Sequence, residues 1–121
     1  MTGLRKYSLV YLATPYTLYH AGIDVAYEDA CRLSARLLLD GVKIFSPIVH
    51  SHAIAEHGNL DPLDHSFWLP INESTMQASD ALLVAKMVGW ENSFGVSHEI
   101  EWFTERGKPV HYLDPVTLAV Q

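Results

Sequence analysis

The stretch Tyr7-Ser8-Leu9-Val10-Tyr11-Leu12-Ala13 decides the fold. It is short, apolar and rich in strand-forming residues, which is typical of a strand buried inside a sheet. Other apolar runs follow it, and helical segments separate them, so the sequence predicts an α/β fold with a parallel sheet. The expected strands are Tyr7–Ala13, Val42–Phe45, Ala81–Ala85 and Pro109–Leu113, and the expected helices are Ile23–Asp40, His65–Gln77 and Gly95–Arg106. Gly41 and Gly107 follow two of these helices, where a left-handed cap is expected.

Residues 48–64 have a weaker pattern. They contain His50, His52 and His57 and the turn signal Asp61-Pro62, and we expect a loop with a short helix. The histidine spacing matches no zinc motif, so no metal site is predicted. His50 follows a strand end and is a candidate for contact with a base or ribose. The other two histidines are expected at the surface.

Composition limits the function classes. The 121 residues are enough for one domain, residues 1–121, with a single core. The net charge is −6 and there is no basic cluster, which argues against a nucleic acid or an anionic membrane as the main partner. The single cysteine, Cys31, and the absence of an N-terminal signal-peptide pattern lead us to expect a cytoplasmic location.

Polar residues follow several of the expected strands. Ligands bind beyond the carboxyl ends of the strands in parallel sheets. We therefore expect Tyr16, Ser46, His50, Gly89 and Ser93, which all follow strand ends, to converge on one crevice. Trp90, in the loop before Ser93, either stacks on a base or packs in the core or an interface.

The segment Ser93-Phe94-Gly95-Val96-Ser97-His98-Glu99 carries the clearest chemical signal. Gly95 lies one helical turn before Glu99 on the same face and leaves open space beside it. Free N–H groups of a first helical turn can point at a ligand there. This arrangement suits a carboxylate that attacks a sugar carbon. The simpler interpretation is a glutamate near a helix N-terminus that interacts favourably with the helix dipole.

Two tyrosines are further candidates. Tyr11 lies near the carboxyl end of the central strand, where its hydroxyl can donate to Glu99 and orient it. A buried strand tyrosine with a local partner is the alternative. Tyr16 follows Pro15 and can form a wall of the ligand site.

Four segments and one residue together resemble the nucleoside 2-deoxyribosyltransferase superfamily, in particular its small bacterial and phage proteins of the DUF1937 type. They are Tyr11–Thr17, Phe45–Ile48, Ser79–Val84, Gly89–Val96 and Glu99. The resemblance extends over nearly the whole chain. It implies a flavodoxin-like three-layer sandwich with a mainly parallel sheet of four to five strands, and a homo-oligomer.

The resemblance also implies an activity. It implies cleavage of the N-glycosidic bond of a nucleoside or nucleotide, or 2-deoxyribosyl transfer, without cofactor or metal. Glu99 matches the glutamate that attacks the anomeric carbon, and Tyr11 matches the tyrosine that holds it. Ser93 and the amide groups near Gly95 match the groups around the sugar 5′ position.

Asn72 departs from the superfamily pattern. It stands eight residues before Asp80, where these enzymes usually have an aspartate. An asparagine can position a base by hydrogen bonds but cannot supply a proton as a carboxylic acid does. Two further interpretations therefore stay open. One is a nucleotide-binding module of the same fold, and the other is a structural or interaction protein.

Overall fold

The computed structural model describes residues 2–121, and it contains one four-stranded sheet with helices on both faces. The strands are β1 (Val10–Ala13), β2 (Ile44–Phe45), β3 (Ala81–Ala85) and β4 (Val110–Leu113). The helices are α1 (Ile23–Leu39), α2 (Pro47–Gly58), α3 (His65–Ala78) and α4 (Phe94–Glu105), with short 3-10 turns at η1 (Thr2–Leu4) and η2 (Trp90–Asn92).

The sheet has the strand order β2-β1-β3-β4, and every pair is parallel. Val10 of β1 pairs with Ile44 of β2 on one side and with Ala81 of β3 on the other. The order confirms the predicted α/β class and the flavodoxin-like arrangement. β1 and β3 are buried along their whole length, as continuous apolar runs predict.

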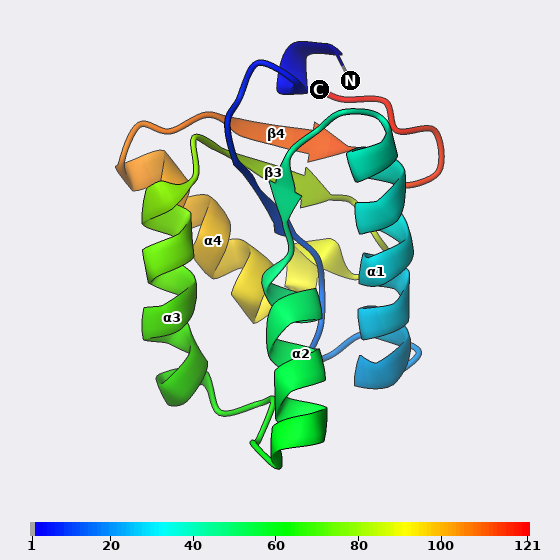
Figure 1. The fold of residues 1–121 in the computed structure, drawn as a ribbon, viewed down its shortest axis with the longest axis vertical. Helices are drawn as coiled ribbons and strands as arrows, with labels where there is room; N and C mark the ends of the chain where they lie inside the picture. The colour runs from blue at the N-terminus through cyan, green and yellow to red at the C-terminus, as the bar shows by residue number, and fades with distance from the viewer. Residues whose placement is uncertain (1) are drawn as a thin grey trace.

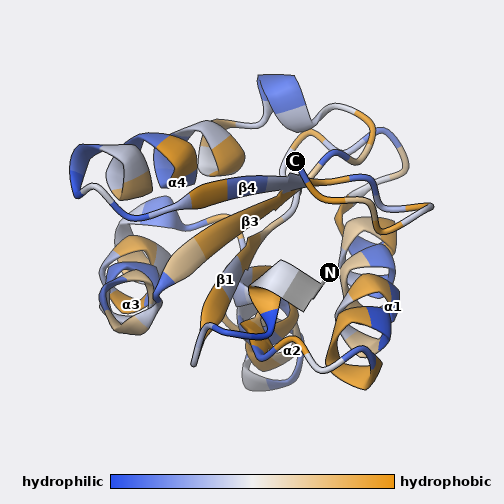
Figure 2. Cartoon of the chain, turned by 90° about the horizontal axis from the view of Figure 1, so that it is seen from above, coloured by the Kyte–Doolittle hydropathy of each residue, from blue (hydrophilic) through white to orange (hydrophobic). Residues whose placement is uncertain are grey.

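The helices form two layers because the chain moves across the sheet in both directions. Right-handed crossovers place α1 on one face and α3 and α4 on the other (Figure 2). Val10 and Leu12 of β1 pack with α1, whereas Tyr11 and Ala13 pack toward α3 and α4. α2 lies between α1 and α3 (Figure 1). None of the helices within residues 2–121 has both the length and the apolar character needed to cross a bilayer.

The structure corrects the prediction for residues 48–64, because α2 is a full helix of 12 residues. Its start is well formed: Pro47 occupies the first turn, and the Ser46 hydroxyl accepts a hydrogen bond from the Val49 N–H at 3.2 Å. Asn59 ends the helix in the left-handed conformation, with φ 57°. The predicted glycine conformations after α1 and α4 are confirmed, with φ 87° at Gly41 and 69° at Gly107.

Two sets of long-range polar contacts stabilise the segments that precede the strands. The Asp80 carboxylate, just before β3, accepts from the Ser8 N–H at 2.8 Å, the Ser8 hydroxyl at 2.7 Å and the Leu9 N–H at 3.2 Å. These donors lower the pKa of Asp80. The second set comes from Lys108, whose ammonium donates to three carbonyl groups at the end of α3: Met76 at 3.1 Å, Gln77 at 2.8 Å and Ser79 at 2.7 Å.

Replacing Lys108 by methionine should lower the free energy of unfolding by about 1–2 kcal/mol, the scale of a charged hydrogen bond. Methionine keeps most of the aliphatic chain, so the loss reports the ammonium and the carbonyl groups that it caps. Urea unfolding of Lys108→Met measures the effect, and Lys43→Met, at an exposed lysine, is the matched control. Equal stability of the two variants would contradict this role.

Candidate functional site

The cleft lies where the chain leaves β1 and β3 toward opposite faces of the sheet. Adjacent parallel strands whose connections diverge in this way leave a crevice beyond their carboxyl ends. Two adjoining cavities of about 70 and 80 Å³ occupy it and share five lining residues: His65, Trp68, Asn72, Gly95 and Glu99. We call these two cavities together the cleft.

The two cavities have different walls. The first lies between α3 and α4, and its other lining residues are Leu69, Met76, Phe94 and His98. The second reaches the segment after β1 and the start of α2; its other lining residues are Thr14, Tyr16, Thr17, Pro47, Ile48, Ser51, Pro62 and Ser93. Each cavity has room for a few waters, because one water needs roughly 10–15 Å³ of such space. The enclosed space therefore suits a small group such as a pentose, with the rest of a ligand in the open mouth.

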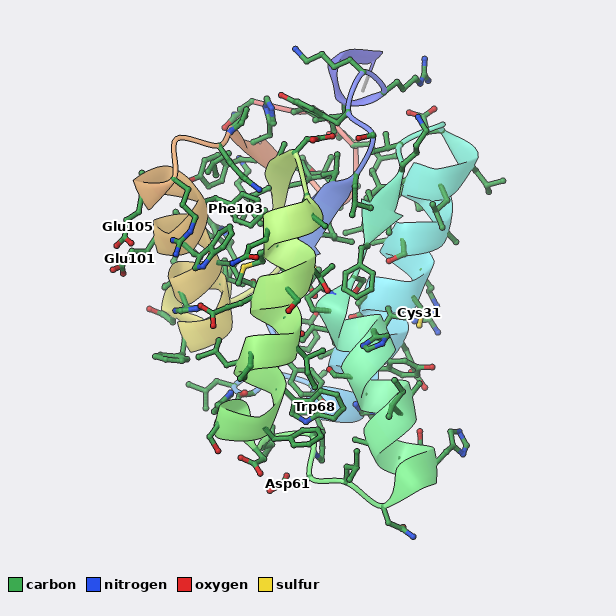
Figure 3. The ribbon with its side chains drawn as sticks, turned by 60° about the vertical axis from the view of Figure 1, so that its left-hand side comes forward. Cys31, Asp61, Trp68, Glu101, Phe103 and Glu105 are labelled. Carbon is green, nitrogen blue, oxygen red and sulfur yellow. The ribbon has the colours of Figure 1, made fainter. Side chains whose placement is uncertain are left out.

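Glu99 is the only carboxyl group that lines the cleft within the described part of the chain. Its side chain is 9% exposed. On the same helix Phe103 faces the sheet, whereas Glu101 and Glu105 point to solvent (Figure 3). Burial raises the pKa of Glu99 to about 8, and the nearby Tyr11 hydroxyl opposes that rise. A proton therefore stays on this carboxyl well above the usual range.

Tyr11 lies beneath Glu99 in the central strand and is fully buried. Its ring packs between Phe45 and Phe103, at centroid distances of 6.2 and 5.9 Å. Its hydroxyl makes no hydrogen bond of good geometry with any described residue, yet it is close enough to Glu99 to affect that group. Burial first, and then the Glu99 carboxylate, raise the pKa of Tyr11 well above its ordinary value. The phenol therefore stays protonated and lies close to the carboxyl.

The N-terminus of α4 forms one edge of the cleft. The Ser93 hydroxyl accepts from the Val96 N–H at 3.3 Å and caps the helix. The N–H groups of Phe94 and Gly95 make no backbone hydrogen bond within residues 2–121, as is usual for a first turn. A Cβ atom added at Gly95 would meet nothing within 4 Å, so this position is open space beside Glu99.

Asn72 and Tyr16 also line the cleft. Asn72 of α3 is half-buried and lines both cavities, so an amide stands where a general acid would be expected. Tyr16 is buried in the second cavity, and its hydroxyl lies 2.6 Å from Nδ1 of His52. Trp68 lines both cavities, and its Nε1 donates a hydrogen bond to the Asp61 carbonyl at 2.9 Å (Figure 3).

Three predicted site residues lie outside the cleft. Ser46 is buried and its hydroxyl caps α2. His50 is exposed one turn further along α2 and packs against the Phe45 ring at 5.5 Å. Trp90 packs against Tyr112 at 5.7 Å, at the side of the core under α4. The position of a residue after a strand end does not determine which face of the following helix carries its side chain. In α2 the side chain of His50 lies on the exposed face.

Sequence reasoning was wrong about His52, which is 5% exposed rather than at the surface. It also missed two buried polar atoms without a described partner, the Thr14 hydroxyl in the second cavity and Nε2 of His98 beside the first. The signal for His52 was available. Small residues Ser51 and Ala55 lie at helical spacing, and a helical wheel drawn over α2 places His52 beside them on the inner face. No group of three histidine, cysteine or acidic side chains suited to a metal ion occurs within the described residues.

A comparison with protein-family models matches residues 8–114 to one described as a domain of unknown function, DUF1937. The match covers most of the chain, so the chain belongs to this family. No curated protein matches the sequence.

The buried carboxyl should make stability fall with rising pH. An ordinary glutamate loses its proton near pH 4.5, whereas folded Glu99 holds it to about pH 8. Between these values the folded chain binds more protons than the unfolded chain. The free energy of unfolding should therefore decrease with pH, by at most about 1.4 kcal/mol per pH unit.

Urea unfolding from about pH 5 to 8 tests this slope. Glu99→Gln should remove much of it and be the more stable protein at the alkaline end. Glu101→Gln, at an exposed position on the same helix, should keep the wild-type slope. The same slope in all three proteins would show that Glu99 titrates normally.

Proposed function

We propose that this member of the DUF1937 family cleaves the N-glycosidic bond of a nucleoside or nucleotide, with Glu99 as the nucleophile. The sugar then passes either to water or to a second base, so the activity is N-glycosidase or 2-deoxyribosyl transfer. No cofactor takes part in the proposed reaction.

One observation carries the proposal: a buried carboxyl faces a buried, unpartnered phenol beside an open space of sugar size. Glu99 lines both cavities, and the Tyr11 hydroxyl is free to donate to it. Gly95 leaves the adjoining position empty. A purely structural glutamate gains nothing from this burial, because the charged form is destabilised and no cation is among the causes that shift its pKa.

The chemistry follows from the environment of Glu99. Once ionised, a poorly hydrated carboxylate attacks C1′ while the bond from C1′ to the base nitrogen breaks. Positive charge develops on the sugar in the transition state and stabilises the carboxylate. The Tyr11 hydroxyl fixes the oxygen that does not react. The product is a glycosyl ester of Glu99. Water or a second base then attacks C1′ and releases the Glu99 carboxylate.

The start of α4 supports binding of the sugar 5′ position. Ser93 and Gly95 line the second cavity and Phe94 lines the first, and the first-turn amide groups of Phe94 and Gly95 make no backbone hydrogen bond within residues 2–121. A helix N-terminus favours an anionic or hydroxyl group by its dipole and its free donors. A 5′-hydroxyl or a 5′-phosphate is therefore the group that we place there.

One observation favours a second candidate, a nucleotide-binding module without turnover. Asn72 lines both cavities, and among residues 2–121 no carboxyl group other than that of Glu99 lines the cleft. An amide can hold a base but cannot protonate it when it leaves.

Incubation with a panel of nucleosides and nucleoside 5′-monophosphates tests the enzyme directly. Wild type should release free base, and Glu99→Gln should abolish at least about 99% of the rate because the nucleophile is lost. A 2′-deoxy-2′-fluoro nucleoside should trap the ester, seen as a glycosyl mass added to the intact protein. Glu101→Gln is the control and should behave as wild type. An undiminished rate or a persistent adduct in Glu99→Gln would exclude this nucleophile.

Asn72→Asp separates the two candidates. If the enzyme turns over and no other group supplies the proton, the added carboxylic acid should raise base release by about 10²-fold or more, the usual gain from general acid catalysis. If the protein only binds, the change should alter affinity in calorimetric titration and yield no free base. A rate that falls in Asn72→Asp would mean that the proton comes from another group.

A further inference from the structure

We infer that Tyr16, His52 and Asp24 form a proton relay at the cleft, in which protonated His52 holds the proton beside Asp24 and Tyr16 passes it to the departing base. This inference rests on the proposed function. It assigns to Tyr16 the role of general acid, which the Asn72 amide cannot perform. The three residues come from the loop after β1, from α2 and from the first turn of α1.

The geometry is a continuous chain of three polar groups. The Tyr16 hydroxyl lies 2.6 Å from Nδ1 of His52, and Nε2 of His52 lies 3.3 Å from the Asp24 carboxylate. Tyr16 lines the second cavity together with Glu99 and Asn72. Asp24 is 87% exposed, so the far end of the chain is in water. One buried imidazole therefore lies between a residue that lines the cleft and a solvent-exposed carboxylate.

His52 is held in a single orientation. The Tyr27 ring stacks on it at a centroid distance of 4.4 Å and an interplanar angle of 17°. The Tyr16 ring meets it edge-on at 5.7 Å. The two ring nitrogens have different neighbours. Nδ1 is hydrogen-bonded to the Tyr16 hydroxyl, and Nε2 lies close to the Asp24 carboxylate.

The partners decide which nitrogen carries hydrogen. A carboxylate only accepts, so Nε2 carries the hydrogen in the neutral imidazole and Nδ1 accepts from the Tyr16 hydroxyl. When His52 is protonated, Nδ1–H donates to the Tyr16 oxygen instead. The hydroxyl hydrogen of Tyr16 is then free to point into the cleft. Protonation of His52 thus turns the Tyr16 hydroxyl from a donor toward His52 into a donor toward the ligand.

The proposed step balances in atoms and charge. As the bond from C1′ to the base nitrogen breaks, its electron pair stays with the base, and the base takes the Tyr16 hydroxyl proton. Tyr16 recovers a proton from Nδ1 of His52, which becomes neutral. Glu99 forms its bond to C1′ and loses its negative charge. After the base has left, water in the cleft returns a proton to Nδ1 of His52 through the Tyr16 hydroxyl, because Nε2 already carries a hydrogen.

Other charged and titratable groups lie around the relay, and none replaces a member. Asp24 and Asp61 contribute, after burial, to raising the pKa of Tyr16 to about 12, so the phenol stays protonated. On the α1 side Tyr27 interacts with Cys31, Glu56 and Glu28. Base release needs ionised Glu99 and protonated His52 together, so its rate should pass through a maximum as pH rises.

The test compares two leaving groups. Natural bases need a proton to leave, whereas 4-nitrophenolate does not, so 4-nitrophenyl β-D-ribofuranoside and its 2-deoxy analogue serve as reference substrates. Tyr16→Phe and His52→Gln should lower kcat for base release by about 10²-fold. The same variants should change kcat on the nitrophenyl substrates by less than about twofold. His57→Gln, at an exposed histidine of the same helix, is the matched control and should leave both rates unchanged.

The pH profile gives a readout that a structural role would not move. The falling limb at high pH should be present for base release by wild type and absent in Tyr16→Phe and His52→Gln. It should also be absent for wild type with the nitrophenyl substrates. Tyr16→Phe keeps the ring and removes only the hydroxyl, so it provides the test even if His52→Gln does not fold.

The outcomes separate the relay from the proposed function. Equal losses on both leaving groups, or an unchanged falling limb, overturn the relay while Glu99-dependent turnover stands. Release of neither base nor 4-nitrophenolate by wild type overturns the proposed function and the relay with it. A loss confined to natural bases supports both.

Discussion

The chain leaves the neighbouring strands β1 and β3 toward opposite faces of the sheet, and the arrangement of the cleft depends on this divergence. Neither helix layer can fill the crevice that opens between the two connections. Tyr16 reaches it from just beyond β1 and Glu99 from the helix after β3, while Tyr11 lies buried in β1 close to Glu99. Groups far apart in the chain therefore meet in one small space, whose lining residues come mostly from the loop after β1 and from α2, α3 and α4.

One physical cause, the removal of water from Glu99, has two effects. It raises the pKa of the carboxyl to about 8 and so makes its charged form costly in the folded protein. The same lack of hydration leaves the ionised oxygen weakly stabilised and reactive. Tyr11 moderates the effect with one donor. The core around Tyr11, with Phe45 and Phe103 against its ring, supplies the rigidity that keeps this unfavourable arrangement in place.

Much of the fold could be predicted from the sequence because the apolar runs are clear. The range Ala81–Ala85 is confirmed to the residue, since a continuous buried run has sharp ends. The first strand is shorter than predicted, because Ser8 and Leu9 bond to the Asp80 carboxylate before the strand ladder begins at Val10. The second strand keeps only two residues, which pair with Val10 and Tyr11 at the edge of the sheet.

The candidate site was predictable only where spacing within one element decides the geometry. Gly95 and Glu99 share a helix, so a turn of separation places them side by side whatever the rest of the chain does. Ser46 and His50 belong to a helix whose direction is set by packing between α1 and α3, and that information is not local. The burial of His52 has the same origin, since Tyr27 and Asp24 come from α1.

The contact between Ser8 and Asp80 spans 72 residues, and it has a consequence for the order of folding. Closing so long a loop costs chain entropy before the pairing of the two central strands can repay it. Helix α1 and the β1–β2 crossover can form without that closure, whereas Tyr11 and Glu99 cannot meet until it is complete. A partly folded chain consequently carries an ordinary, hydrated glutamate, and the unusual carboxyl exists only in molecules that have finished folding.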